Sequence, residues 1–381
     1  MTLLGYEWRK LARMPVLWAV LTLCAIFNCT QMLEIAPYID LFNEAGEAAS
    51  QLGQRVDGDF LTGLRQREQT SYRDALLEAV EGMENVFETL DIQVLSAYYE
   101  KYMDSSPLAQ SLMAWKYDMA EERAAHLART GAAMDLYAGP VTTQVHQFLF
   151  GNLLLKVLME SAVLGMLSIL YLQGYEDIQH TTHAVCATRT GRKLWRPKVL
   201  AGVGAAVGLY AVLAGSALAA FFTVWDFSGI WSASVSSQFN RHSDLLISRP
   251  FITWADFSVA GYLAAVLLLG GAVVTVLALL AAVIGLLVRN VYLAGLVLMA
   301  LCISGYAAGV AIAGLGWWEA FVVFTFNPVL LLLEVNAWFT EVGMNTFIPW
   351  QETVGIVGSL ALLSGGTALA LGRFRRKDVL V

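Results

Sequence analysis

The chain has 381 residues, of which 57% are hydrophobic and only 14% charged, whereas soluble domains carry about 25% charged residues. So few polar side chains could not cover so much apolar surface in water. The composition therefore excludes an ordinary soluble protein and favours one embedded in lipid. The formal net charge of −7 is unevenly spread, because residues 34–146 hold 19 acidic and 8 basic side chains. An acidic, water-exposed insert on a mildly basic membrane part is predicted.

Six segments have the roughly 20 mostly apolar residues that a spanning helix needs: 14–33, 148–173, 198–224, 257–288, 291–313 and 351–371. The predicted fold class is all-α, a polytopic membrane protein with six transmembrane helices and a large helical insert between spans one and two. A shorter apolar stretch, Phe321 to Val335, is interrupted by Asn327-Pro328. It indicates re-entrant or interfacial helices within residues 314–350, not a seventh span.

Basic residues indicate the orientation of these spans. They collect before span one, between spans two and three, after span four at Arg289, and after span six. Cytoplasmic loops carry such an excess of Lys and Arg. The connection 174–197, the tail 372–381 and both termini are therefore predicted to be cytoplasmic. The insert 34–147, the loop 225–256 and the segment 314–350 are then extracellular.

Residues 1–13 are predicted to form an amphipathic helix on the inner membrane surface. Leu4, Trp8 and Leu11 recur at helical spacing, and Arg9, Lys10 and Arg13 lie to the other side. The alternative is a cleaved signal peptide, which is disfavoured because no small-residue cleavage site follows residues 27–29.

The insert is predicted to be a helical hairpin. Its first helix has an apolar seam with alternating spacings of four and three, at Leu76, Val80, Met83, Phe87, Leu90 and Val94. Ser106 and Pro107 are typical of an N-cap and a first helical residue. The return helix has an apolar face at Leu108, Leu112, Trp115 and Met119. Such a hairpin would project about 45 Å, as a structural or dimer-facing antenna; a receptor domain is the alternative.

No motif for catalysis or nucleotide binding stands out in the sequence. It contains no G-x-x-x-x-G-K-[ST] phosphate loop and no G-x-S-x-G elbow. We therefore expect a non-catalytic chain without a cofactor of its own, and any nucleotide energy must come from another subunit. Asp177, His180, His183 and Cys186 recur every third residue. Steps of three drift by about 60° on a helix, so a polar loop helix is favoured over a metal site.

Two ionisable residues lie inside the second predicted span. Lys156 and Glu160 are four positions apart, so they share one helix face. A buried carboxylate is costly unless it is paired or lines a polar path. A structural pair is the favoured interpretation, and a substrate or proton contact on a translocation path is the alternative.

The connection after span two carries a resemblance to a known family. It contains Glu176, Asp177 and Thr181, then Gly191-Arg192, and finally Lys198 at the start of span three. This pattern resembles the cytoplasmic loop of permease subunits of type-two ABC exporters, where a Glu is followed by Gly-Thr, a Ser/Gly-Arg pair and a Lys. His180 stands where the family has Gly. The amphipathic N-terminal helix, the six spans and the helices near 314–350 are also similar to that family.

The resemblance implies a function and partners. Residues 174–190 would be a coupling helix that docks on a separate cytoplasmic ATPase subunit, which binds ATP and Mg. Glu176, Asp177, Thr181, Arg192 and Lys198 would belong to this coupling region. Two permeases, as identical copies or paralogues, would export an amphipathic substrate such as a peptide, antibiotic or lipid across the bacterial cytoplasmic membrane.

The implied partners are the ATPase subunit, the second permease and membrane lipid, with no nucleic acid. Two alternatives remain open. A secondary transporter or channel would need no ATPase, but the sequence shows no clear inverted repeat. A membrane sensor would signal through its helical ectodomain.

Overall fold

The computed structural model describes residues 2–103, 105–188, 191–240, 251–288 and 290–376, without the side chains of Cys186, Arg192 and residues 374–376. Arg289 lies outside the described residues. The helices, in chain order, are α1 Leu3–Ala12, α2 Pro15–Gln31, α3 Ile39–Leu52, α4 Gly58–Gln66, α5 Ser71–Glu81, α6 Val86–Thr89, α7 Ile92–Tyr102, α8 Pro107–Thr130, α9 Ala138–Val141, α10 Thr143–His146, α11 Leu154–Ile178, α12 Thr182–Ala187, α13 Trp195–Phe222, α14 Val259–Leu287, α15 Val291–Gly314, α16 Trp318–Phe324, α17 Pro328–Leu333 and α18 Gln351–Arg376.

The described residues form an all-α protein, with isolated β-bridges as their only extended pairing. Six of the described helical stretches are long and apolar enough to cross a membrane: Pro15–Leu52, Thr143–Ile178, Trp195–Phe222, Val259–Leu287, Val291–Gly314 and Gln351–Arg373. Each overlaps one of the segments expected from hydropathy. The predicted all-α chain with six such helices is confirmed.

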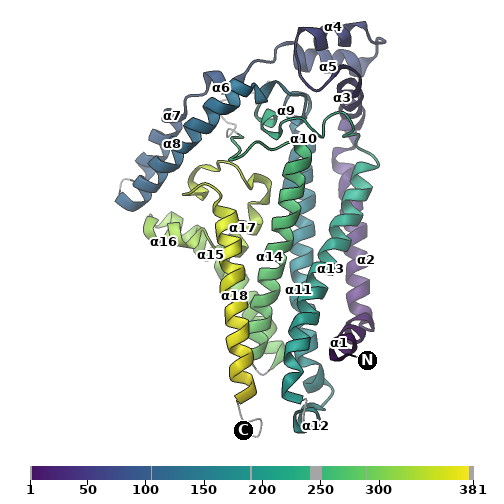
Figure 1. The fold of residues 1–381 in the computed structure, drawn as a ribbon, viewed down its shortest axis with the longest axis vertical. Helices are drawn as coiled ribbons and strands as arrows, with labels where there is room; N and C mark the ends of the chain where they lie inside the picture. The colour runs from purple at the N-terminus through teal and green to yellow at the C-terminus, as the bar shows by residue number, and fades with distance from the viewer. Residues whose placement is uncertain (1, 104, 189–190, 241–250, 289, 377–381) are drawn as a thin grey trace.

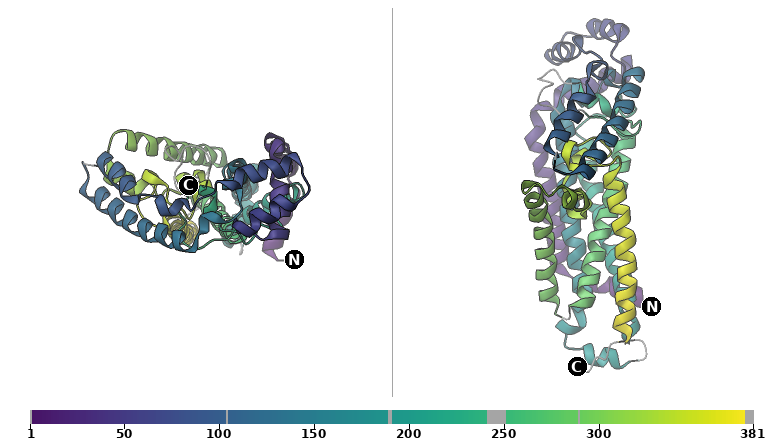
Figure 2. Two further views of the ribbon diagram at one scale, coloured as in Figure 1. Left: turned by 90° about the horizontal axis from the view of Figure 1, so that it is seen from above. Right: turned by 90° about the vertical axis from the view of Figure 1, so that its left-hand side faces the viewer.

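The long helices pack as one bundle around α11 and α14 (Figure 1). Figure 2 shows α15 and α18 at opposite edges of the bundle, and both contact α14. Glycines set the close approach of α11 and α13. A Cβ at Gly165 would lie 2.6 Å from Ala206 Cβ, and one at Gly202 would lie 2.3 Å from Ile169 Cγ1. Small residues therefore allow these two helices to touch along their backbones.

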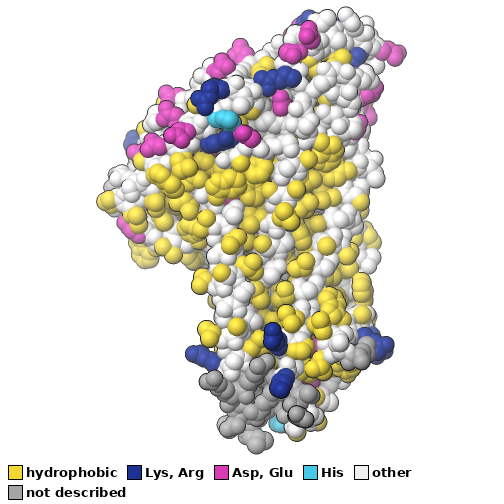
Figure 3. All heavy atoms as spheres, viewed as in Figure 1, with side chains coloured by type: hydrophobic (Ala, Val, Ile, Leu, Met, Phe, Trp, Pro, Cys, Tyr) yellow, Lys and Arg dark blue, Asp and Glu magenta, His cyan; other side chains and the backbone are white. Residues whose placement is uncertain are grey.

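The two ends of the bundle differ in charge. Both termini and α12 lie at one end, and the insert lies at the other (Figure 1). Most Asp and Glu side chains on the face shown in Figure 3 lie over the insert, a broad apolar zone covers the middle, and Lys and Arg recur at the end that bears α12. This arrangement is typical of a protein that crosses a lipid layer along its long axis.

The continuous seam expected from Leu76 to Val94 is wrong. The first helix, α5, ends at Glu81, the short α6 follows, and α7 begins only at Ile92. Val94 is exposed. The break is held by tertiary hydrogen bonds, since Asn85 Nδ2 donates to the Ala128 carbonyl and Asn240 Nδ2 donates to the Glu84 carbonyl. Long-range contacts thus override the local apolar pattern.

The second helix of the insert begins as predicted. Ser106 is the N-cap of α8, its Oγ accepts from the Ala109 amide, and Pro107 is the first helical residue. However, α8 does not project freely as an antenna. Its buried Lys116 Nζ lies 3.1 Å from Glu341 Oε1 and also donates to the carbonyls of Gly343 and Thr346. The insert is therefore docked on the loop that precedes α18.

A second tie joins α8 to the loop before α14. Arg123 and His126 both contact the Asp256 carboxylate, at 2.8 and 3.0 Å. The hydrogen bond from Arg123, with a further one from His126, holds the pKa of Asp256 below its usual value.

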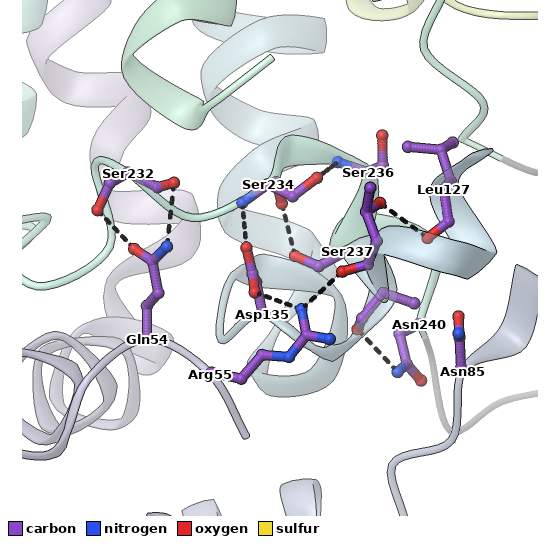
Figure 4. A network of polar contacts seen from close by, with 12 residues as sticks. Gln54, Arg55, Asn85, Leu127, Asp135, Ser232, Ser234, Ser236, Ser237 and Asn240 are labelled. Atoms are coloured by element: carbon purple, nitrogen blue, oxygen red, sulfur yellow. Dashed lines mark hydrogen bonds and ion pairs between the residues drawn. The ribbon is translucent and has the colours of Figure 1, made fainter. Parts of the chain in front are cut away.

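The remaining part of the insert is tied to the loop after α13 (Figure 4). Asp135 accepts from Arg55 at 3.2 Å and from the Ser234 amide at 2.7 Å. Gln54 exchanges two hydrogen bonds with Ser232. Contacts in several regions thus fix the insert to the end of the bundle opposite α12.

Two short helices, α16 and α17, replace a seventh span. Asn327 caps α17 through its Oδ1, which accepts from the Val329 amide, and Pro328 is the first helical residue. The interruption expected at Asn327-Pro328 is therefore present, and neither helix is long enough to cross a bilayer.

We predict that Lys116→Met loosens the docked insert. The substitution leaves the Glu341 carboxylate buried without its ammonium partner, which costs about 3–5 kcal/mol. Hydrogen exchange should accelerate in α8 and in residues 341–346. Lys101→Met, which removes an exposed ammonium from α7, is the matched control. Equal exchange in the two variants would contradict this role.

Candidate functional site

The candidate site is a buried cluster of four charged side chains at the end of the bundle that bears α12. Glu176 lies in the last turn of α11, Lys198 in the first turn of α13, and Glu7 and Lys10 on α1. All four are buried, with exposed fractions of 4% for Glu176, 0% for Lys198, 0% for Glu7 and 7% for Lys10. We call these four residues the Glu176 cluster.

Glu176 joins the three helices. Its Oε1 accepts from Lys10 Nζ at 2.8 Å, and its Oε2 contacts Lys198 Nζ. Lys10 also lies 2.8 Å from Glu7 Oε1, one turn earlier on α1. The four side chains alternate as acid, base, acid, base, so their charges balance. One carboxylate thus fixes the amphipathic helix to the end of span two and the start of span three.

Aromatic rings complete the surroundings of the two ammonium groups. Lys10 Nζ lies 4.5 Å from the centroid of the Tyr175 ring and 5.0 Å from that of Tyr6. Lys198 Nζ lies 4.9 Å from the Trp195 ring centroid. Ring faces attract cations, so these contacts offset part of the cost of removing both charges from water.

The backbone of the same segment ends α11 in a defined turn. The Thr181 amide donates to the Glu176 carbonyl at 2.9 Å, and the His180 amide donates to the Asp177 carbonyl at 3.1 Å. His180 has φ +55°. This pair of bonds around a left-handed residue is a Schellman motif. Glu176 therefore anchors the turn through its carbonyl and the neighbouring helices through its carboxylate.

The segment 174–190 is not the single helix that the family resemblance implies. Residues up to Ile178 continue α11, the Schellman turn follows, and α12 covers only Thr182–Ala187. The Asp177 carboxylate is exposed and accepts from Thr182 Oγ1. His183 and Ala184 on α12 are exposed. This end of the chain thus presents a short helix that a hydrogen-bonded turn joins to α11.

The residues expected to form the coupling region have different structural roles. Glu176 and Lys198 form a direct ion pair, and Thr181 and Asp177 belong to the turn. The side chain of Arg192 lies outside the described part of the chain. The described residues hold no group of three or more His, Cys, Asp or Glu side chains that could share a metal ion.

Lys156 and Glu160 do not pair with each other among the described contacts. Lys156 Nζ donates to Gln31 Oε1 at 2.6 Å, and Glu160 Oε2 accepts from Asn28 Nδ2 at 2.7 Å. The predicted structural pair of Lys156 and Glu160 is therefore not a direct ion pair among the described residues. Both residues instead join span two to polar side chains of span one.

Glu7 and Lys10 are the residues of this site that the sequence analysis missed. Lys10 had been placed with Arg9 and Arg13 on the polar face of α1, whereas the structure buries it with Glu7 and Leu11. One feature of the sequence could have indicated this pair: Glu7 and Lys10 are three positions apart, so they lie on the same face of a helix.

No family model, curated protein or solved structure matches this chain.

We predict that Glu176→Gln destabilises the protein by about 3–5 kcal/mol, because Lys10 and Lys198 would then share one remaining carboxylate in a buried place. Adding Lys198→Met should recover most of the loss, since the Glu7–Lys10 pair is then complete. The free energy of unfolding in detergent measures both effects. Asp177→Asn, next in sequence but exposed, is the control, and a double variant no more stable than the single one would contradict the account.

We also predict that His180→Gly stabilises the protein, by about 1 kcal/mol, because a left-handed conformation costs an L-residue about 1–2 kcal/mol and glycine nothing. His180→Val should destabilise it. Unfolding of the two variants under the same conditions tests this. A stabilising valine at position 180 would be incompatible with the turn.

Proposed function

We propose that this chain is the membrane-spanning permease subunit of an ATP-driven ABC exporter. It would couple to a separate cytoplasmic ATPase subunit and form, with a second permease copy or paralogue, the path for an amphipathic substrate. The observation that carries this proposal is the rigid mounting of α12 by the Glu176 cluster and the Schellman turn.

The mounting suits the transfer of force. A push on α12 reaches α11 through a turn with two backbone hydrogen bonds. From Glu176 it reaches α1 through Lys10 and α13 through Lys198. These three helices would therefore move as one unit when the ATPase dimer closes on ATP. Packed elements with fixed contacts shift as rigid bodies and do not deform continuously.

The position of His180 supports the family resemblance. The motif has glycine at this point, and the backbone of His180 adopts the left-handed conformation that glycine favours. The chain thus has the backbone geometry that glycine would adopt at this position of the motif, although the residue here is histidine.

The distribution of charge supports the sidedness. The end that bears α12 also carries basic residues in or beside α1, the start of α13 and the end of α18, namely Arg9, Arg13, Lys193, Arg196 and Arg373. With the positive-inside rule, this end and both termini lie in the cytoplasm, and the acidic insert is extracellular. The bacterial cytoplasmic membrane is the membrane that the resemblance implies.

The outer helices of the bundle are available for a partner in the membrane. In the most apolar part of the stretch Pro15–Leu52, which contains α2, only 17% of the residues are buried, and in that of α15 only 11% are buried. Lipid or a second permease would cover these faces. Lys156 and Glu160, which contact Gln31 and Asn28 of span one, would then lie near a path between two copies.

A disruption of α12 that leaves the Glu176 cluster intact tests the proposal. Glu176→Lys would be uninformative, because Glu176 is buried. Ala184→Arg places a long charged side chain on exposed α12 without touching the cluster. It should lower the amount of a co-purifying ATP-binding subunit about tenfold, equivalent to 1.4 kcal/mol.

The matched control is Ala97→Arg on exposed α7, at the opposite end of the molecule. Purification in mild detergent with quantitative identification of partners measures both variants. If the native chain retains no ATP-binding subunit, a secondary transporter or a membrane sensor replaces the exporter. If both variants lose the same amount of the ATP-binding subunit, α12 is not part of the contact with that subunit.

A further inference from the structure

A cavity of about 390 Å³ lies between α15, α16, α17, the loop 334–346 and the start of α18. Its size is within the range of pockets that hold small organic molecules. The proposed function does not use it. In Figure 1, α16 and α17 lie below α8, in the half of the molecule that carries the insert.

The polar groups of the cavity are acidic or neutral. Glu334 and Glu352 line it together with Asn345 and Thr346, and no described Lys, Arg or His does. Glu352 is only 4% exposed, and no described basic side chain forms an ion pair with it. Thr353 Oγ1 donates to Glu352 Oε1 at 3.2 Å, but this hydrogen bond leaves the carboxylate without an ion-pair partner, and a cation beside it would be favourable.

A hydroxyl in the cavity wall lacks a partner. Thr346 is 8% exposed, and its buried Oγ1 makes no hydrogen bond. The backbone around it is fixed, because its carbonyl accepts from Lys116. A buried polar atom without a partner is costly, so this part of the cavity wall contains one polar group that the described contacts leave unsatisfied.

Aromatic rings form part of the apolar wall. Tyr306 comes from α15, Phe321 from α16, and Trp338 from the loop. The indole of Trp338 is held by its Nε1, which donates to the Leu331 carbonyl at 2.7 Å. Ring faces attract organic cations, and apolar side chains such as Val310 and Leu330 suit an apolar body.

The frame of this loop is strained at two bulky residues. Phe339 and Trp350 have φ values of +63° and +60°, and their rings pack at 5.7 Å. Residues in this conformation persist only where surrounding contacts hold them, so these two rings fix the chain next to the cavity without lining it.

We propose that this cavity binds a lipophilic organic cation. Its ammonium group lies against Glu334 and Glu352, and its apolar body lies against α15, α16 and Trp338. The ammonium group can belong to a free amphipathic amine or to the head group of an aminolipid. Binding at this site requires neither ATP nor a second subunit, so it stands apart from the exporter assignment.

The test uses dansylcadaverine, a fluorescent naphthalene carrying a primary ammonium, with the full chain in uncharged maltoside micelles. Energy transfer from tryptophan to the dansyl group should show a saturable component. An analogue with the same dansyl body and a terminal methyl in place of the ammonium should bind at least tenfold more weakly. This comparison needs no variant. Equal affinities, or no saturable transfer, would overturn the proposal.

The carboxylates are tested by Glu334→Gln and Glu352→Gln together. The double variant should lose the preference for the ammonium probe over its uncharged analogue. Glu319→Gln, which removes an exposed carboxylate of α16 outside the cavity, should keep it. A preference that persists in the double variant would refute the assigned cation site.

Competition distinguishes the two sources of the ammonium group. Displacement of the probe by phosphatidylethanolamine, and not by phosphatidylglycerol, would assign the cavity to an aminolipid. Probe binding that neither lipid displaces would assign it to a free amine. Displacement by both lipids alike would show that the probe occupies an unselective apolar surface, and the proposal would fail.

Discussion

The end of the bundle that bears α12 depends on one buried carboxylate. Glu176 contacts Lys10 and Lys198 at once, so it joins the N-terminal helix α1 to the second and third spans, α11 and α13, at a single point. Removing charges from water is expensive, and such a cluster is tolerated only when its members are matched and well placed. Here the charges balance, and three aromatic rings lie beside the ammonium groups. The Schellman turn adds a backbone anchor at the same residue.

The end of the bundle that bears the insert also contains a buried and paired lysine. Lys116 of the insert is buried against Glu341 and two loop carbonyls. Between the two ends, the helices touch through small residues such as Gly165 and Gly202. The molecule therefore has a buried Lys–Glu contact at each end of a closely packed bundle. The peripheral helices α2 and α15 leave most of their apolar surface uncovered.

The long helices were predictable from the sequence, because their length and hydropathy are local properties. The starts of α8 and α17 were predictable too, since Ser106-Pro107 and Asn327-Pro328 are local capping signals. The break after α5 was not, because it depends on Asn85 and Asn240 reaching distant carbonyls. Lys10 looked like a surface charge until packing buried it. The cavity is formed by residues between Tyr306 and Glu352 that only the fold brings together.

A double-mutant cycle between Lys10 and Glu176 tests the central claim most directly. The free energies of unfolding of Lys10→Met, Glu176→Gln and the combined variant give their interaction energy. Residues in one buried charge network are coupled by about 0.5–3 kcal/mol, and we expect a value in the upper half of that range. Losses that simply add, as they do for distant sites, would show that α1 and α11 are not joined through this carboxylate.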